Sequence, residues 1–390
     1  MAPPPLTLPA LFWRFLRFGV LAFGGPVAQI AMLREALVEK ERWVEPARFN
    51  RLLAVMQALP GPEAHELCVH LGIVARGRIG GLLAGLGFLL PGFALMMALA
   101  WAYTAFIAGR ADFAAALLGV QIAVLAVIAR ALPKIARHIL TARPLYGYAA
   151  LALAATLVGV PFWIPLIAAG VFHAAFREGF FAVAAVGVTV MLASEFLPDA
   201  NAMSSARSAA PGAASLGALF LAGLKGGLLT FGGAYTAIPY VRADTAGRGW
   251  LTDAQFLDGV ALANIIPAPL VIFATFAGYV AGGPWGGLAI TAGMFLPAFA
   301  FSMIFYERLE ALVDEPRLHR FLDGVAAAAM GIIAATLVQL ALATWPRIET
   351  PGFALAIFAA ALMAAFAIRR AWAAPAIIAG GAVAGWVVLP

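Results

Sequence analysis

The chain has 390 residues, of which 64% are hydrophobic and 11% are charged, and it carries a net charge of +6. Soluble domains have about 25% charged residues, so this composition excludes a soluble globular protein and indicates a membrane protein with several spans. The single cysteine, Cys68, excludes an intramolecular disulfide and a multi-cysteine metal site, and no secretory signal is visible.

The first half of the chain is predicted to begin with two apolar segments that are interrupted by Gly and Pro. The first covers residues 7–33 and is broken at Gly24-Gly25-Pro26, and the second covers 52–72 and is broken at Pro60-Gly61-Pro62. A charged amphipathic stretch at 34–51 lies between them. Uninterrupted apolar segments are then expected at 80–107, 113–131, 145–160, 161–175 and 179–197. Breaks survive in lipid only where protein or a wet cavity satisfies the freed backbone groups, so both breaks are predicted to lie inside the protein.

The second half repeats this plan after a polar run at residues 199–210, which we interpret as a linker. Two breaks recur, at Phe231-Gly232-Gly233 and at Pro267-Ala268-Pro269. A full span needs about 20 residues, so the short fifth and sixth segments of each half are compatible with one tight helical hairpin. The apolar segments of this half are expected at 212–241, 254–281, 284–305, 321–345, 352–368 and 371–389.

The two halves are related by a duplication. Matching landmarks recur with an almost constant offset, which is 208 residues from Phe23 to Phe231, 207 from Trp43 to Trp250 and from Pro60 to Pro267, and 206 from Pro91 to Pro297. We therefore predict an all-α polytopic membrane protein with two homologous halves, each of about six segments with broken or re-entrant helices. The predicted organisation is a first repeat at 1–178, a connecting span and polar linker at 179–211, and a second repeat at 212–390.

The orientation of the halves follows from counting the segments. One extra span between two six-segment halves would place the second half upside down, which predicts an inverted repeat. With about thirteen crossings and a cytoplasmic N-terminus, 16 Lys and Arg residues fall inside and 8 outside, as the positive-inside rule favours. Basic residues at 34–51 are the exception, and they move inside if the broken segments are re-entrant hairpins. Hairpins and broken spans both stay open.

Paired interrupted segments at corresponding positions of two halves are typical of a transporter binding site. Helices that restart after such breaks offer unpaired N–H groups and about half a positive charge each, and glycine lets an anion approach the backbone. The sequence therefore predicts an anion transporter. A lipid-linked transferase would need clustered acids for a divalent metal, and none occurs within the predicted spans. A scaffold protein would not need matched breaks.

A set of short motifs runs through both halves in the same order. The motifs are Phe23-Gly24-Gly25-Pro26, Arg34-Glu35, Arg42-Trp43, Gln57-Ala58-Leu59-Pro60-Gly61-Pro62-Glu63, Gly80-Gly81-Leu82, Leu90-Pro91-Gly92, Phe231-Gly232-Gly233-Ala234-Tyr235, Gly249-Trp250-Leu251 and Gly286-Gly287-Leu288. Over nearly the whole chain they resemble the chromate ion transporter family in its long, two-domain form. The resemblance implies a bacterial inner-membrane protein of chromate resistance that exports chromate, driven by the proton motive force, with sulfate as a look-alike.

Two places depart from the family's usual pattern. The second-half break has Ala268 where Pro-Gly-Pro is usual, with Asn264 at the position of an expected acid. In the first half, His65-Glu66 replaces a glutamine-rich pair. These departures leave the exact oxyanion and the coupling open. The direction of transport is open as well, because export and uptake use the same architecture. The alternatives are sulfate or another inorganic oxyanion, and uptake in place of export.

We expect the substrate to bind where the broken segments of each half meet. The substrate-binding candidates are Phe23, Gly24, Gly25, Pro26, Arg34, Gln57, Pro60, Gly61, Pro62, Lys225, Phe231, Gly232, Gly233, Asn264, Pro267 and Pro269. The proton-coupling candidates are Glu35, Glu63, His65 and Glu66, because imidazole titrates near neutral pH and burial can bring a carboxyl toward it. Simpler roles compete with these, namely packing at the glycines, an interfacial ion pair for Arg34, a helix cap for Glu63 and snorkelling for Lys225.

The expected partners are an inorganic oxyanion, a proton as the coupling ion and the lipid bilayer. No nucleic acid, cofactor, metal or catalytic residue is expected. A homodimer is left open.

Overall fold

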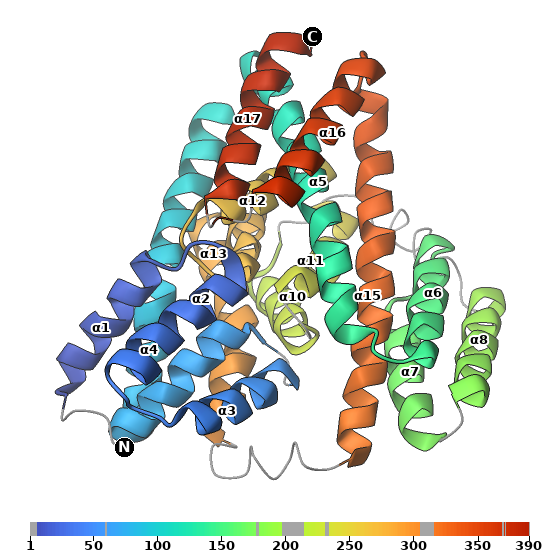
Figure 1. Cartoon of the computed structure of the whole chain (residues 1–390). Coiled ribbons are helices and arrows are strands. Elements are labelled where there is room, and N and C mark those ends of the chain that lie inside the picture. Colours follow the sequence, from blue (N-terminus) through green and yellow to red (C-terminus); the bar gives the residue numbers. More distant parts are fainter. Residues whose placement is uncertain are drawn as a thin grey trace.

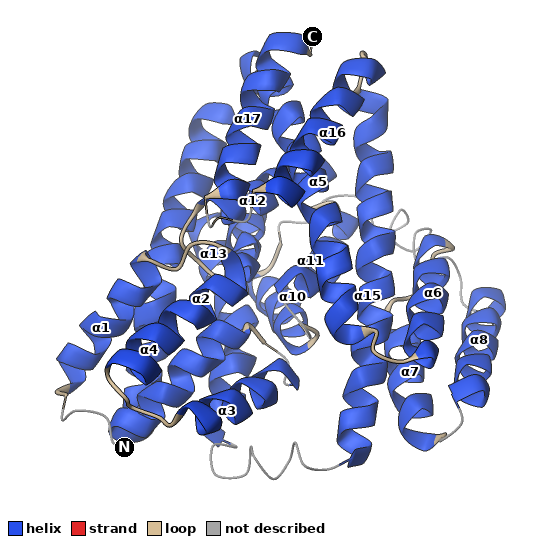
Figure 2. Cartoon of the chain, in the orientation of Figure 1, coloured by secondary structure: helices blue, strands red, loops and turns tan. Residues whose placement is uncertain are grey.

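The computed structural model describes residues 6–58, 61–176, 179–196, 214–230, 234–304, 316–368, 370 and 372–389. Within these ranges the fold is all-helical and has no strand (Figure 2). The predicted linker at 199–210 and the last residues before it lie outside the described part. The all-α prediction is confirmed.

The described residues of the first half form seven α-helices, two short π-helices and the 3₁₀-helix η3 (Ala111–Phe113). Thr7 caps the first helix by accepting a hydrogen bond from the Ala10 N–H at 3.4 Å, and Gly24 adopts the left-handed conformation that starts the second. The elements are α1 (Leu8–Val20), α2 (Gly25–Leu33), η1 (Arg34–Lys40), α3 (Pro46–Ala58), α4 (Glu63–Ala102) with η2 (Tyr103–Ile107), α5 (Ala114–Ile139), α6 (Arg143–Leu157) and α7 (Trp163–Ala175). Helix α8 (Gly179–Phe196) follows and leads to the second half.

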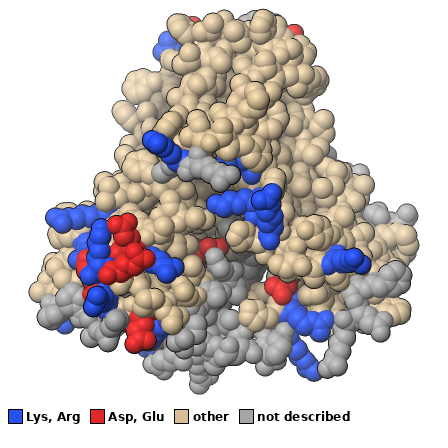
Figure 3. Space-filling view, viewed as in Figure 1, with Lys and Arg blue, Asp and Glu red and all other residues tan. Residues whose placement is uncertain are grey.

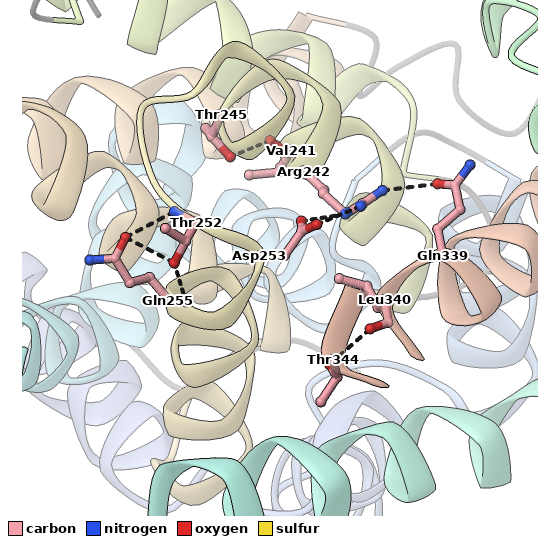
Figure 4. A network of polar contacts seen from close by, with 9 residues as sticks. All are labelled: Val241, Arg242, Thr245, Thr252, Asp253, Gln255, Gln339, Leu340 and Thr344. Atoms are coloured by element: carbon pink, nitrogen blue, oxygen red, sulfur yellow. Dashed lines mark hydrogen bonds and ion pairs between the residues drawn. The ribbon is translucent and has the colours of Figure 1, made fainter. Parts of the chain in front are cut away.

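The second half repeats the order of the first. Its elements are α10 (Leu216–Leu228), η4 (Ala234–Thr236), α11 (Ala237–Asp244), η5 (Ala246–Arg248), α12 (Asp253–Ile265), η6 (Leu270–Ile272), α13 (Phe273–Ile304), α15 (Pro316–Thr344) with η7 (Trp345–Arg347), α16 (Pro351–Ala367) and α17 (Ala373–Val388). A reciprocal capping box formed by Thr252 and Gln255 starts α12 (Figure 4). Helix ends therefore fall at each of the four breaks that the sequence predicts.

Each half has one long helix near its start, α4 or α13, and the two helices contain the same kink. Helix α4 leaves helical geometry at Arg76 (φ −148°, ψ 32°) and Gly77 (φ 63°, ψ −166°). Helix α13 does so at Gly282 (φ −147°, ψ 22°) and Gly283 (φ 65°, ψ −161°), which are 206 residues further on. The positive φ explains why glycine is present at the second position of each kink. The expected separate segments at 52–72 and 80–107 are thus joined through a kink.

Packing within each half is also repeated. A Cβ on Gly87 would lie 2.8 Å from the carbonyl oxygen of Phe12, so α4 touches the backbone of α1. A Cβ on Gly293 would lie 2.1 Å from the carbonyl oxygen of Phe220, so α13 touches α10 in the same way. Small residues at membrane helix contacts allow this close approach. The duplication therefore extends from the sequence to the packing.

Helices of each half pack against helices of the other half. Helix α5 of the first half packs against α16 and α17 of the second, whereas α15 of the second half packs against α6 and α7 of the first. Helices α4 and α13 pack against each other. In Figure 1, α5 runs downward from the top of the view and its counterpart α15 runs upward from the bottom. These two equivalent helices run in opposite directions in this view.

Four of the described helices are long and apolar enough to cross a membrane. They are Glu63–Ile107, Ala111–Ile139, Leu270–Ile304 and Arg317–Arg347. Five further apolar helices have 10–17 residues. On the face seen in Figure 3, charged side chains gather in the lower half and are sparse in the upper part. The membrane class is confirmed, and the number of thirteen crossings stays a prediction.

Candidate functional site

The breaks of the two halves are hydrogen-bonded to each other. The Gly61 N–H donates to the carbonyl oxygen of Thr230 at 2.9 Å. The Gln29 side-chain Nε2 donates to the carbonyl oxygens of Ala22 at 2.8 Å and Ala268 at 3.0 Å. Ala22 and Thr230 are 208 residues apart, and Gly61 and Ala268 are 207 apart. Each half's second break is therefore held against the other half's first break. We call residues 21–29, 61–66, Thr230 and 264–270 the break junction.

The long helices α4 and α13 make the same reciprocal contacts between the halves. A Cβ on Gly92 of α4 would lie 2.4 Å from the Cβ of Ala268. The equivalent residue of α13, Ala298, has its Cβ 3.4 Å from the position of a Cβ on Gly61. A contact in which residue i touches j and the equivalent of j touches the equivalent of i is the pattern of a two-fold interface. The contacts of the break junction are thus reciprocal, as in an approximate two-fold arrangement of the halves.

The start of α4 brings three of the four predicted proton-coupling residues to the junction. Glu63 is the first residue of the helix and is partly exposed, whereas His65 and Glu66 have 0% exposed side chains. Side chains of a helix lean toward its N-terminus, and the Glu66 Oε1 accordingly lies 2.4 Å from where a Cβ on Gly61 would be. The His65 ring packs edge-on against Phe295 and Phe299, with centroids 5.1 Å and 4.7 Å away.

Glu66 and His65 are the groups of this cluster whose buried side-chain polar atoms have no hydrogen-bond partner among the described residues. For Glu66 this holds for both carboxyl oxygens. The same holds for the Oε1 of Gln29, whose side chain is 1% exposed. A buried acceptor without a donor costs about 1–3 kcal/mol, and more if it is charged. Three unpaired acceptor atoms on two side chains of this junction therefore point to a ligand or a proton that satisfies them.

The predicted cations lie apart from these acceptors and have acidic partners. The Lys225 Nζ is 2.7 Å from Asp244 Oδ2 and 4.5 Å from the ring centroid of Phe162. Asp244 also pairs with Arg248 at 3.1 Å. Arg34 is exposed on η1, where it pairs with Glu39 at 3.3 Å. Among the described residues, neither the Lys225 nor the Arg34 side chain makes an interaction with the break junction.

Glu35 likewise lies on the exposed η1 helix rather than at the junction. Its Oε1 accepts a hydrogen bond from Lys40 Nζ at 2.7 Å, and this bond lowers the pKa of Glu35. A carboxyl with a lowered pKa stays ionised near neutral pH and is a poor proton carrier. The structure therefore separates Glu35 from Glu63 and Glu66, with which the sequence had grouped it.

The remaining candidates are distributed around the junction. Phe23 is 43% exposed in the α1–α2 connection, and Pro26 follows Gly25 in the first turn of α2. Pro62, Pro267 and Pro269 are buried. The side-chain Nδ2 of Asn264 donates to the carbonyl oxygen of Val260 at 2.8 Å, and its Oδ1 accepts from the Tyr235 hydroxyl at 3.3 Å. The Gln57 side chain, Pro60 and Phe231-Gly232-Gly233 lie outside the described residues.

A cavity of about 270 Å³ lies between the α6–α7 connection of the first half and α11, α12 and α15 of the second. Arg242 lines it and makes a bidentate ion pair with Asp253, at 2.7 Å and 2.8 Å, while its Nη1 donates to Gln339 at 2.9 Å (Figure 4). Arg242 is the counterpart of Arg34, 208 residues earlier. The Arg242 side chain is 20% exposed and the Arg34 side chain is 44% exposed, so the two equivalent positions differ in burial.

A second polar network was missed by the sequence reasoning. Asp258 of α12 is 3% exposed and accepts hydrogen bonds from the Tyr103 hydroxyl at 2.8 Å and from Gln121 Nε2 at 2.9 Å. Arg347 Nη1 donates to Gln121 Oε1 at 2.7 Å. The only signal in the sequence is that Asp258 is a lone acid in an apolar run. The network connects residues of both repeats.

The comparison with protein families shows to which family the chain belongs. The model of the chromate transporter family matches the chain twice, at residues 9–176 and at residues 217–386. The chain belongs to the chromate transporter family. Each match includes both breaks of one half, and members of the family are transporters rather than enzymes.

Named members of the chromate transporter family cover the chain from end to end. A chromate transport protein of Pseudomonas aeruginosa is 54% identical over 100% of this chain and 94% of its own length. A chromate transport protein of Cupriavidus metallidurans is 32% identical over 99% of this chain and 94% of its own length. A probable chromate transport protein of Synechococcus elongatus is 30% identical over 98% of this chain and 96% of its own length. No solved structure matches the chain.

Proposed function

We propose that this protein exports chromate across the cytoplasmic membrane, driven by the proton motive force, and that chromate binds at the break junction. The observation that carries the proposal is the hydrogen-bonded meeting of the two halves' breaks around Glu66 and Gln29. Three relatives of nearly the same length are named as chromate transport proteins or as a probable one. The start of α4 offers backbone N–H groups to an oxyanion.

The proposed architecture is an inverted repeat of residues 1–178 and 212–390, with α8 as the connecting span and a cytoplasmic N-terminus. It is supported by the opposite directions of α5 and α15 and by the reciprocal contacts of the break junction. In such transporters one repeat moves against the other around a fixed site near the midplane. The side chains of Arg34 and Arg242 are 44% and 20% exposed at equivalent positions, which supports two halves in different conformations.

We further propose that the short helices are paired as hairpins. At 1.5 Å per residue, helices of 13–17 residues are about 20–26 Å long, less than the ~30 Å hydrocarbon core. Helices α6 and α7 pack against each other, as do α16 and α17. The broken pair α1 and α2 is interpreted in the same way, as a re-entrant segment.

Sulfate is the second candidate substrate, because it shares the tetrahedral shape and the charge of chromate. The deciding experiment measures chromate movement in everted membrane vesicles energised by respiration, with sulfate as competitor and an uncoupler as control. Uptake that collapses with the uncoupler supports export driven by the proton motive force. Movement of sulfate without chromate would replace the substrate, and no movement of either anion would overturn the transport proposal.

The first prediction concerns Glu63. Glu63→Gln is expected to reduce energised chromate uptake about tenfold or more, because the partly exposed carboxyl at the junction is proposed to carry the coupled proton. The measurement is uptake rate per amount of protein in the membrane. Glu39→Gln, which removes an exposed acid of η1, is the matched control and should transport normally. A Glu63→Gln protein with wild-type rates would leave Glu63 with only a helix-start role, worth about 0.3–1 kcal/mol of stability.

A further inference from the structure

We propose that Arg130, Lys134 and Arg137 of α5 form a capture site for the oxyanion beside the break junction, and that this site exists on one side of the protein only. We call these three side chains the basic face. The inference rests on the proposed function and adds the residues that take the anion from water. Its basis is a group of cations without acidic partners on α5 and the lack of cations at the equivalent positions of α15.

The three cations share one face of α5. They are spaced by four and three residues, which places them on one stripe of the helix. Arg130 is half-buried, whereas Lys134 and Arg137 are exposed. Among the described residues, no ion pair joins any of the three to an acid. Like charges at these spacings repel each other and destabilise a helix, and a bound anion would remove that repulsion.

Two electrostatic contacts place this part of α5 beside the break junction. Arg130 lies close enough to Tyr235 for its charge to act on the phenol, and the Tyr235 hydroxyl donates to Asn264 Oδ1 at 3.3 Å. His138, in the last turn of α5, acts in the same way on Glu63, the first residue of α4. Lys and Arg side chains gather near the centre of the face seen in Figure 3, where Figure 1 places the lower part of α5. The basic face is therefore accessible from water and close to a break of each half.

The helix dipole does not account for all three cations. It favours basic residues in the last turn of a helix, which holds Arg137 and His138. Arg130 lies nine residues before Ile139, more than two turns from the end, where the dipole no longer acts. The positive-inside rule explains basic residues near helix ends, but not a half-buried one beside the junction. A cation in that position is a candidate for binding a mobile anion.

Helix α15 is the counterpart of α5 in the second half, and its residues can be matched one to one. The two helices end at Ile139 and Thr344, which are 205 residues apart, as are Gly119 and Gly324. A Cβ on Gly119 would lie 2.1 Å from a carbonyl oxygen of α17, and a Cβ on Gly324 would lie 2.3 Å from a carbonyl oxygen of α7. Helix ends and packing contacts therefore give the same offset.

At this offset, the three cations correspond to Ala335, Gln339 and Leu342, none of which is charged. Gln339 accepts a hydrogen bond at 2.9 Å from Arg242, whose charge is already paired with Asp253. In Figure 1, α5 ends in the lower part of the view and α15 ends at its top. The described part of the chain thus offers an unpaired basic face at the end of α5 and no equivalent face at the end of α15.

An unpaired basic face can take up an oxyanion without trapping it. A surface of one charge sign raises the local concentration of the opposite ion and increases association rates about 10- to 1,000-fold, less at high salt. An Arg guanidinium binds two oxygens of such an anion, whereas exposed ion pairs are weak enough to let it leave. The attraction acts on charge, so sulfate competes with chromate here. With a cytoplasmic N-terminus α5 ends on the cytoplasmic side, and one-sided capture favours export.

The test measures the KM for chromate in everted vesicles, whose outer face is the cytoplasmic one. Arg130→Gln/Lys134→Gln/Arg137→Gln is expected to raise this KM about tenfold at low ionic strength, with the maximal rate per amount of inserted protein within about twofold of the wild type. Its KM should no longer depend on salt between about 0.01 M and 0.15 M, where the Debye length falls from about 30 Å to about 8 Å. In right-side-out vesicles with an uncoupler, the KM for entry should stay at the wild-type value.

Single variants make the result independent of the folding of the triple variant. Lys134→Gln changes one exposed side chain and is expected to raise the KM about threefold. Lys134→Arg keeps the charge and should keep the wild-type KM. Arg110→Gln is the matched control, because it removes an exposed cation that pairs with Asp112 near the other end of α5, and it should transport normally.

The outcomes distinguish this inference from the function on which it rests. If the wild type moves no chromate, the proposed function fails and the capture site fails with it. If chromate moves but the neutralised variants keep the wild-type KM and salt dependence, the capture site is overturned while the function stands. An equal shift of KM from both sides would overturn the one-sidedness. A maximal rate that depends on anionic lipid, with KM unchanged in the variants, would assign the basic face to lipid headgroups instead.

Discussion

Replacement of Gly61 by alanine is expected to lower chromate transport about tenfold or more, with near-normal amounts of protein in the membrane. Gly61 has φ +145°, and an added Cβ would lie 2.4 Å from Glu66 Oε1 and 3.1 Å from its carboxyl carbon. The left-handed backbone itself costs an alanine about 1–2 kcal/mol. The larger effect is positional, because the Glu66 carboxyl group must leave the junction or the Gly61–Thr230 hydrogen bond must lengthen.

The control for this variant isolates the cost of the backbone conformation. Gly109 has φ +76° in the connection after η2, and nothing lies within 4 Å of the Cβ that alanine would add there. Gly109→Ala therefore carries a similar backbone strain without touching the break junction. We expect it to transport at close to the wild-type rate. Equal losses in both variants would indicate backbone strain alone, and normal transport by Gly61→Ala would place the substrate path elsewhere.

The parts of the fold that depend on local chemistry were predictable from the sequence. Clusters of Gly and Pro disfavour helix, and the breaks before Gly25 and Glu63 were placed correctly without any knowledge of tertiary structure. The duplication was equally visible, because each half must solve the same backbone problem with the same residues. The paired kinks at Gly77 and Gly283 confirm the offset of the repeat in backbone angles.

Contacts between distant segments were not predictable in the same way. Gln29 was passed over because its two acceptors, Ala22 and Ala268, belong to different repeats that lie side by side only in the folded chain. Lys225 and Arg34 were placed in the site by charge alone, since their acidic partners could not be identified from sequence spacing. The assignment of Glu66 depended on burial and orientation, which the apolar composition of the whole chain conceals.

Replacement of Asp258 by alanine is expected to destabilise the protein by about 2–3 kcal/mol, the second large effect. The variant leaves the Tyr103 hydroxyl without its acceptor and leaves the Gln121 Nε2 with only a 3.4 Å hydrogen bond to the carbonyl oxygen of Ala254. Hydrogen bonds to a charged group contribute about 1.5–3 kcal/mol each, and relief from burying the carboxylate offsets part of that loss. The thermal unfolding midpoint in detergent should fall by a few degrees, and an unchanged midpoint would contradict a structural role for the network.

Asp258→Asn tests whether the direction of each hydrogen bond matters. Gln121 donates to Asp258 through Nε2 while its Oε1 accepts from Arg347, so its amide cannot turn over without losing Arg347. An asparagine oxygen can still accept from Tyr103, but its NH₂ group would face the NH₂ group of Gln121. The stability of Asp258→Asn should therefore lie between those of the wild type and Asp258→Ala. Since Tyr103 and Gln121 belong to one repeat and Asp258 and Arg347 to the other, Asp258→Asn loosens the contact between the halves about which transport is proposed to turn.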